Sequence, residues 1–192
     1  MRLTLLALIA GLLCSCSDKN PTPGAAPNYQ TMHHLTFKGA MFHFNHEGNY
    51  YIGCSIHQGG IANGAQLLRD DQENAVVIKK RVHKQKDLHV WTYDESTLSP
   101  ETALPYLGDP DIRVGDRIYI LNKKRRIAAT VRALPQGNGY HYGYQTFKPF
   151  PAGGMSGSPV FSVRTGTVVG VLQTANSKTK ATMGGFEALK MP

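Results

Sequence analysis

The feature that most restricts the fold of this chain is a succession of short β-type runs separated by turn residues, with no long amphipathic helix between them. Apolar residues that alternate with polar ones over about four to eight positions are typical of strands with one buried face. The predicted strands cover residues 41–44, 49–55, 75–82, 88–93, 116–122, 126–134, 139–147, 158–163, 167–174 and 181–189. About a dozen short strands with frequent turns predict an antiparallel β-sandwich or β-barrel.

Residues 96–111 interrupt this succession of short strands, because they carry Pro100, Pro105 and Pro110. Proline removes a backbone donor and favours turns and loops. The segment therefore predicts a connector between two β units, the first over about 31–95 and the second over about 112–192. Within the first unit, Asn45-His46-Glu47-Gly48 predicts a hairpin turn between two strands.

The composition is that of a globular chain with a surplus of positive charge. Apolar residues make up 41% and charged residues 18% of the 192 positions, which allows a packed core and excludes global disorder. The formal net charge of +8 favours anionic partners such as membrane surfaces or acidic peptides. The sequence lacks the signature of a nucleic-acid-binding module, so we expect no nucleic-acid partner.

Two basic clusters stand out in the sequence. They are Lys79-Lys80-Arg81, with Lys84 and Lys86 nearby, and Lys123-Lys124-Arg125-Arg126. Both predict solvated hairpin tips, because runs of like charge are excluded from a core. The alternative is a surface site for anions such as lipid headgroups.

Residues 1–16 resemble a bacterial lipoprotein signal. Arg2 is followed by an apolar run over residues 3–13, which is too short to cross a membrane as an ordinary helix. Cys16 fits the lipobox motif better than Cys14, which follows a bulky leucine. The resemblance implies lipidation of Cys16 and anchoring in the cell envelope, at the outer membrane facing the periplasm. A plain secretory signal is the alternative.

Residues 17–30 follow this signal and contain three prolines together with glycine and alanine, so they predict a flexible tether. The cysteines then leave no internal disulfide, since Cys14 departs with the signal and Cys16 carries lipid. Only Cys54 stays in the folded domain. It lies in an apolar run, which predicts burial as a small apolar residue rather than a reactive role.

The chemistry of the chain is concentrated in Gly153-Gly154-Met155-Ser156-Gly157-Ser158-Pro159-Val160. Glycines let a backbone turn tightly, expose a serine hydroxyl and direct consecutive N–H groups to one place. Such a turn suits a nucleophilic serine. The alternative is an ordinary glycine-rich β-turn.

This segment resembles the Gly-x-Ser-Gly-Gly-Pro sequence around the nucleophile of trypsin-like (chymotrypsin-family) serine peptidases, and of their HtrA-like bacterial members. Residues 51–57, which end in His57, resemble the strand that leads to the catalytic histidine of that family. Lys86-Asp87-Leu88-His89-Val90 resembles the segment around the catalytic aspartate, and the order His, Asp, Ser also agrees. The resemblance implies an all-β fold of two antiparallel six-stranded β-barrels and an exported, lipid-anchored serine endopeptidase.

The resemblance also implies a role for each site residue. His57 would take the proton of Ser156 as it attacks a peptide carbonyl, and Asp87 would hold the imidazole in the correct tautomer. The backbone N–H groups of Gly154 and Ser156 would form the oxyanion hole. Met155 stands where digestive members carry an aspartate, so activation through a newly cut N-terminus is not implied.

Other residues compete for these roles. His89 is the rival of His57, because it lies two positions after Asp87, and Asp94 is the rival of Asp87. His43 lies beside the predicted hairpin turn and is expected at the surface.

The resemblance places the substrate pocket at Leu172, Gln173 and Thr174, and none of these is charged. The expected partner is a protein or peptide substrate, without a preference for lysine or arginine at the cleaved bond. Neither a cofactor nor a metal is implied. Ile56 stands where the family has a small residue, which leaves a second reading open: a catalytically inactive peptidase-fold lipoprotein that binds peptides or envelope components.

Overall fold

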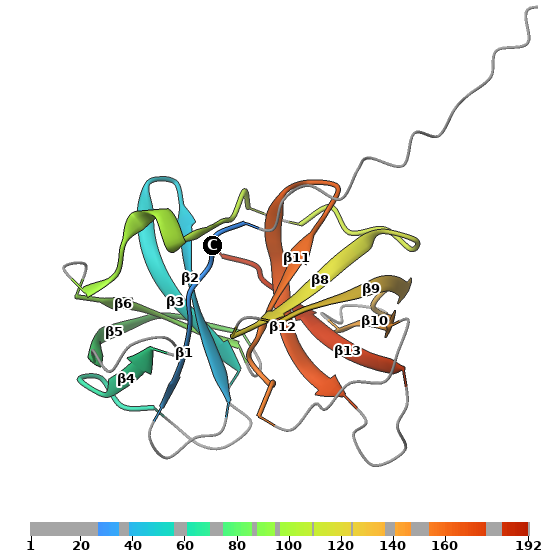
Figure 1. Ribbon diagram of the computed structural model, residues 1–192. Helices are drawn as coiled ribbons and strands as arrows, with labels where there is room; N and C mark the ends of the chain where they lie inside the picture. Colours follow the sequence, from blue (N-terminus) through green and yellow to red (C-terminus); the bar gives the residue numbers. More distant parts are fainter. Residues whose placement is uncertain are drawn as a thin grey trace, which may run out of the picture.

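The computed structural model of the chain describes residues 27–34, 39–55, 61–69, 75–85, 88–94, 97–108, 110–123, 125–136, 141–146, 154–175 and 182–191. Figure 1 shows these residues arranged as two β-barrels that lie side by side. No α-helix occurs within the described ranges, and a short 3-10 turn, η2 (Pro100–Thr102), lies in the connector. None of the described segments forms an apolar helix long enough to cross a lipid bilayer.

The first barrel is formed by six strands. They are β1 (Thr31–His34), β2 (Ala40–His46), β3 (Asn49–Ser55), β4 (Gln66–Arg69), β5 (Ala75–Gln85) and β6 (Leu88–Tyr93). Their order is β1-β4-β5-β6-β3-β2, and pairing of β1 with β2 closes the barrel. The short strand β7 (Leu104–Pro105), within the predicted connector, adds to β2 in parallel.

The second barrel also has six strands and is closed in the order β10-β13-β12-β11-β8-β9. They are β8 (Arg117–Asn122), β9 (Arg125–Ala133), β10 (His141–Thr146), β11 (Pro159–Ser162), β12 (Thr167–Ala175) and β13 (Met183–Ala188). The predicted fold class of two antiparallel six-stranded barrels is therefore confirmed. Strands β1 and β4 were not predicted from the sequence.

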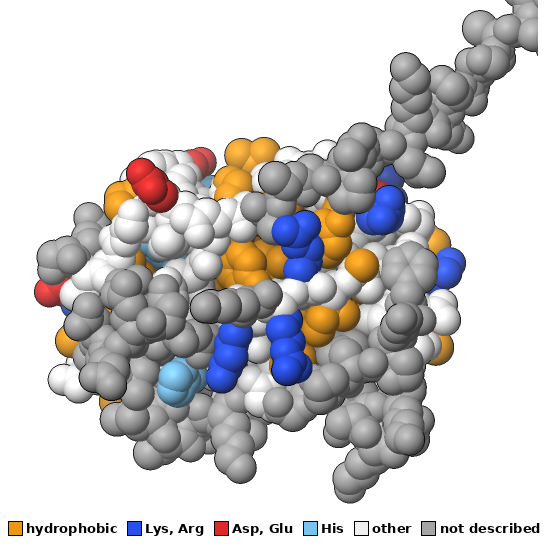
Figure 2. All heavy atoms as spheres, in the orientation of Figure 1, with side chains coloured by type: hydrophobic (Ala, Val, Ile, Leu, Met, Phe, Trp, Pro, Cys, Tyr) orange, Lys and Arg blue, Asp and Glu red, His pale blue; other side chains and the backbone are white. Residues whose placement is uncertain are grey.

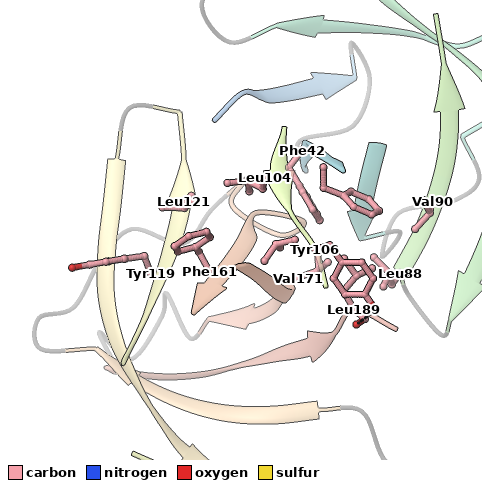
Figure 3. Close-up of a cluster of buried hydrophobic side chains, with 12 residues drawn as sticks. Phe42, Leu88, Val90, Leu104, Tyr106, Tyr119, Leu121, Phe161, Val171 and Leu189 are labelled. Atoms are coloured by element: carbon pink, nitrogen blue, oxygen red, sulfur yellow. Dashed lines mark hydrogen bonds between the residues drawn. The ribbon is translucent and has the colours of Figure 1, made fainter. Parts of the chain in front are cut away.

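Three buried clusters hold the barrels together. One fills the first barrel around Trp91 and Ile52, and another fills the second around Tyr144 and Phe186. The third lies between the barrels and joins strands of both with the connector (Figure 3). Its members are Phe42, Phe44, Leu88, Val90, Leu104, Tyr106, Tyr119, Leu121, Phe161, Val168, Val171 and Leu189. Because this shared cluster is apolar and buried, separating the barrels would expose it to water.

The predicted hairpin turn joins β2 to β3. Glu47 and Gly48 form the turn with φ values of 51° and 80°, whereas Asn45 and His46 still belong to β2. Two successive left-handed residues match the twist of the flanking strands, which is why such turns dominate two-residue hairpins.

The two basic clusters differ in where they lie. Lys123 follows β8 and Arg125 begins β9, and Asn122 pairs with Arg125, so the described residues of the second cluster lie at a hairpin tip as predicted. Residues 79–81 instead lie within β5, between two shifts in its register with β6. The prediction of a hairpin tip is wrong for this first cluster, although its side chains are exposed.

His43 is fully buried, so the prediction of a surface histidine is wrong. Each of its two ring nitrogens lies within hydrogen-bonding distance of a hydroxyl group. Tyr93 Oη lies 2.6 Å from Nε2, and Thr102 Oγ1 lies 3.3 Å from Nδ1. Because the Thr102 hydroxyl already donates to the Ser99 carbonyl, it accepts from Nδ1–H, and Tyr93 donates to Nε2. Burial lowers the pKa of His43 from 6.5 to about 4, so the ring is neutral at pH 7.

Candidate active site

Ser156 lies in a tight turn that precedes β11, and it is half-buried. Gly154 and Gly157 flank it with φ values of 78° and 91°, in the left-handed region that other residues rarely adopt. Among the described residues, the backbone N–H groups of Gly154 and Ser156 have no hydrogen-bond partner. The turn therefore presents one hydroxyl and leaves two N–H donors available close to it.

The turn is fixed to the first barrel through its backbone. The Ala40 N–H donates to the Ser156 carbonyl at 2.7 Å. A Cβ on Gly157 would lie 2.0 Å from the Ala40 carbonyl oxygen, which no real structure tolerates. Glycine at 157 is thus required both by its φ value and by the close approach of β2.

The same turn is fixed to the second barrel. The Gly157 N–H donates to the Leu172 carbonyl, and the Leu172 N–H donates to the Ser158 carbonyl, both at 2.8 Å. Ser158 is fully buried, and its hydroxyl accepts a hydrogen bond from Asn122 Nδ2 at 2.8 Å. Ser158 is therefore a structural residue, and Ser156 is held at the junction of the two barrels.

A series of hydrogen bonds leads from Ser156 into the interface between the barrels. Ser156 Oγ donates to Ser55 Oγ at 3.5 Å, and Ser55 Oγ donates to Gln173 Oε1 at 3.0 Å. Gln173 Nε2 donates to Glu187 Oε2 at 3.3 Å, and Gln85 Nε2 donates to Glu187 Oε1 at 3.1 Å. Ser55 and Gln85 belong to the first barrel, whereas Gln173 and Glu187 belong to the second.

Glu187 determines the direction of these bonds. The two carboxyl oxygens of Glu187 accept hydrogen bonds from the NH₂ groups of Gln85 and Gln173, so Gln173 turns its carbonyl oxygen to Ser55. The single Ser55 proton then goes to Gln173, and the Ser55 oxygen can only accept from Ser156. Glu187 is fully buried, so its carboxyl group is satisfied by protein donors rather than by water.

Comparison with solved structures identifies the fold. The chain is similar to the serine protease of a human pathogenic astrovirus, with 17% identity, a TM-score of 0.59, and coverage of 86% of this chain and 91% of the viral one. It is similar to kallikrein-related peptidase 10, with 14% identity, a TM-score of 0.60, and coverage of 87% and 92%. The chain has the trypsin-like serine protease fold.

The HtrA-type protease AlgW shares this trypsin-like fold, with 17% identity and a TM-score of 0.57 over 85% of the present chain. The present chain matches 61% of the length of that protease. No family model matches the sequence, and no curated protein matches it by sequence. At these sequence identities, the similarity shows that the chain shares the trypsin-like fold and nothing more.

Two of the predicted catalytic residues, His57 and Asp87, lie outside the described residues. Their nearest described neighbours in the sequence belong to adjacent strands of the trypsin-like first barrel. Ser55, two positions before His57, ends β3, and Leu88, directly after Asp87, begins β6. Ser55 and Leu88 are register partners in the antiparallel pairing of these strands.

The rival His89 lies inside β6, opposite Cys54 and buried. Its ring centroid lies 5.5 Å from that of Trp91, which is a packing contact. Cys54 is free and buried, as predicted, and burial raises the pKa of its thiol. Met155 packs in the interior of the second barrel.

The predicted pocket residues lie on β12, but two of their side chains face other partners. Leu172 packs inside the second barrel with 1% of its surface exposed. The Gln173 side chain is buried and bonded to Ser55 and Glu187. Both side chains are therefore buried against protein partners, and the assignment of the substrate pocket to β12 stays a prediction. Thr174 pairs through its backbone with Gly185, and its side chain lies outside the described part.

Sequence reasoning missed Ser55, Gln85 and Glu187 as neighbours of the site. A signal was present for Glu187, because it is an acidic residue inside the apolar run Phe186–Leu189. Within the described ranges, no three His, Cys, Asp or Glu side chains lie close enough together to hold a metal ion.

Proposed function

We propose that this chain is a serine endopeptidase with Ser156 as the nucleophile, His57 as the general base and Asp87 as its carboxylate partner. The observation that carries the proposal is the Ser156 turn itself. The turn lies where the two barrels of a trypsin-like fold meet, and left-handed glycines flank its serine. It presents the Ser156 hydroxyl together with two backbone N–H groups that have no hydrogen-bond partner among the described residues.

The reaction follows from the chemistry of these groups. His57 takes the Ser156 proton as Oγ attacks the peptide carbonyl, and the N–H groups of Gly154 and Ser156 stabilise the oxyanion. The His57 imidazolium, stabilised by Asp87, then protonates the leaving amine and releases it. A water molecule hydrolyses the acyl-enzyme by the same steps in reverse. Loss of one oxyanion donor costs on the order of 10²–10³ in rate.

The end of β12 offers a place for the substrate backbone. β11 pairs with β12 only up to Val171, so Gln173–Ala175 extend past the end of β11 while β13 continues on their other side. An extended peptide can pair with such a strand segment through its main chain. Two structures with similar folds are of the HtrA-type protease AlgW, one with a decapeptide and one with a tripeptide. We infer a peptide substrate in this position.

The test is labelling of the intact protein by a fluorophosphonate probe, which reacts with activated serines. The wild-type chain should be labelled, and Ser156→Ala should abolish the labelling. Ser99→Ala, at an exposed serine in the connector, is the matched control and should be labelled like the wild type. Absence of labelling in the wild type, or labelling that survives Ser156→Ala, contradicts the proposal.

The base and its partner need a second set of variants. His57→Ala and Asp87→Asn should slow labelling strongly, whereas His89→Asn and Asp94→Asn, the matched rivals, should not. An inactive peptide-binding module would behave differently. It would bind a peptide library equally well with and without the Ser156 hydroxyl, and the probe would label neither protein.

We also propose that lipid on Cys16 anchors the protein in the cell envelope, at the outer membrane facing the periplasm. Cys16 lies outside the described residues, so the support is its lipobox-like sequence. Metabolic labelling with palmitate should mark the wild type and the Cys14→Ala variant, and Cys16→Ala should lose the label. Equal labelling of all three proteins would contradict this assignment.

A further inference from the structure

The predicted tether joins the folded domain at the β8–β9 hairpin. Tyr29 Oη donates to the Arg125 carbonyl at 3.0 Å, and the Lys123 N–H donates to Thr31 Oγ1 at 2.9 Å. Tyr29 lies two residues before Thr31, which begins β1. The point where the chain enters the fold is thus fixed to the basic tip of the second barrel.

The described cations of this tip lie at the surface. Lys123, Arg125 and Arg126 are exposed, and none of them forms an ion pair with a described residue. In contrast, Arg164 is held by the carboxylates of Asp111 and Asp116. The charge of the tip is therefore free to act on an external partner.

Apolar surface adjoins these cations. The Arg126 guanidinium lies over the Tyr119 ring, 5.0 Å from its centre, in a cation–π contact. Tyr29, Ala128 and Val163 are only partly buried against the cluster between the barrels. Figure 2 shows Lys and Arg side chains beside apolar surface in the middle of this face, with most visible acidic side chains at its upper left.

We infer that the β8–β9 tip, comprising Lys123, Arg125 and Arg126 and the apolar residues beside them, is a surface that binds the anionic headgroups of a lipid bilayer. Cationic and partly buried apolar side chains on one face suit the interface between headgroups and water. The proposed lipid on Cys16 supports this inference, because it would hold the domain close to a membrane. Twelve residues separate Cys16 from Tyr29, and a random chain of that length has a mean extent of roughly 20 Å, comparable to the radius of the domain. The tip would then be the part of the domain closest to the anchor.

The test is sedimentation of the lipid-free chain, residues 17–192, with vesicles of phosphatidylcholine containing phosphatidylglycerol or none. Every described contact lies within residues 27–191, so this chain retains all three buried clusters. The wild type should bind the anionic vesicles and should not bind the neutral ones. Its binding to the anionic vesicles should weaken as the salt concentration is raised. Because each interfacial cation contributes about fivefold to binding, Arg125→Gln with Arg126→Gln should weaken it by about 30-fold.

The matched control removes the same charge from the other basic cluster. Lys79→Gln with Lys80→Gln on β5 should weaken binding by less than about threefold, because β5 belongs to the other barrel and charges more than about 10 Å from the bound surface are screened. Equal losses in the two double variants would show that only net charge matters, and would overturn the inference. Failure of the wild type to bind anionic vesicles would overturn it as well. Palmitate labelling tests the anchor separately, so the two proposals can fail independently.

Discussion

His43 gives a prediction in which both sign and magnitude follow from the structure. Its ring is fully buried, and its two nitrogens are engaged by Tyr93 and Thr102 in a neutral tautomer. Protonation would place a charge in this buried position and would give Nε2 a proton directed at the Tyr93 hydroxyl. The perturbation is a fall in pH from 7 to 4, compared between the wild type and His43→Gln, which cannot titrate.

The magnitude comes from proton linkage. Burial lowers the pKa of His43 to about 4 in the folded protein, against about 6.5 in the unfolded chain. The stabilisation is fully present above pH 6.5 and is lost as the pH falls toward 4, because only the unfolded chain then binds the proton. The free energy of unfolding should fall by about 1.4 kcal/mol per pH unit from this residue, or roughly 3 kcal/mol in all.

The assay is urea unfolding of both proteins at several pH values between 4 and 7, followed by tryptophan fluorescence. Other titrating groups affect both proteins alike, so the difference between their unfolding free energies isolates His43. The advantage of the wild type over His43→Gln should shrink by roughly 3 kcal/mol between pH 7 and pH 4. A difference that stays constant over this range would refute the reasoning, and an NMR titration showing a His43 pKa near 6.5 would do so directly.

Three further predictions concern the site and its surroundings. Gly157→Ala should destabilise the fold by more than about 3 kcal/mol in chemical denaturation, whereas Gly166→Ala, also left-handed but in open space, should cost only about 1–2 kcal/mol. Ser55→Ala should lower kcat about threefold at unchanged KM in a peptide-cleavage assay, because the Ser55 hydroxyl orients the Ser156 side chain, and Ser55→Thr should restore kcat. An equal loss in Ser55→Thr would count against the hydroxyl as the cause. The Cys54 thiol should resist a colorimetric thiol reagent until urea unfolds the chain, since burial both shields it and raises its pKa.

Local sequence patterns predicted a large part of the fold. Alternating apolar residues located most strands, and Glu47-Gly48 located the first hairpin, because strand alternation and left-handed turns depend on neighbouring residues alone. The glycines around Ser156 likewise indicated a tight turn that exposes a hydroxyl. Their φ values and the free N–H groups agree with that expectation.

What local patterns could not predict depends on partners far away in the chain. The sequence by itself determined a β-rich chain of two units and a serine held between glycines. Only the tertiary structure decided that His43 is buried, since its partners come from β6 and the connector. It also joined the Gln173 side chain to Ser55 and Glu187, residues 118 and 14 positions away. The physical reason is that a buried carboxylate must find hydrogen-bond donors, and only the packing of the two barrels brings those donors to it.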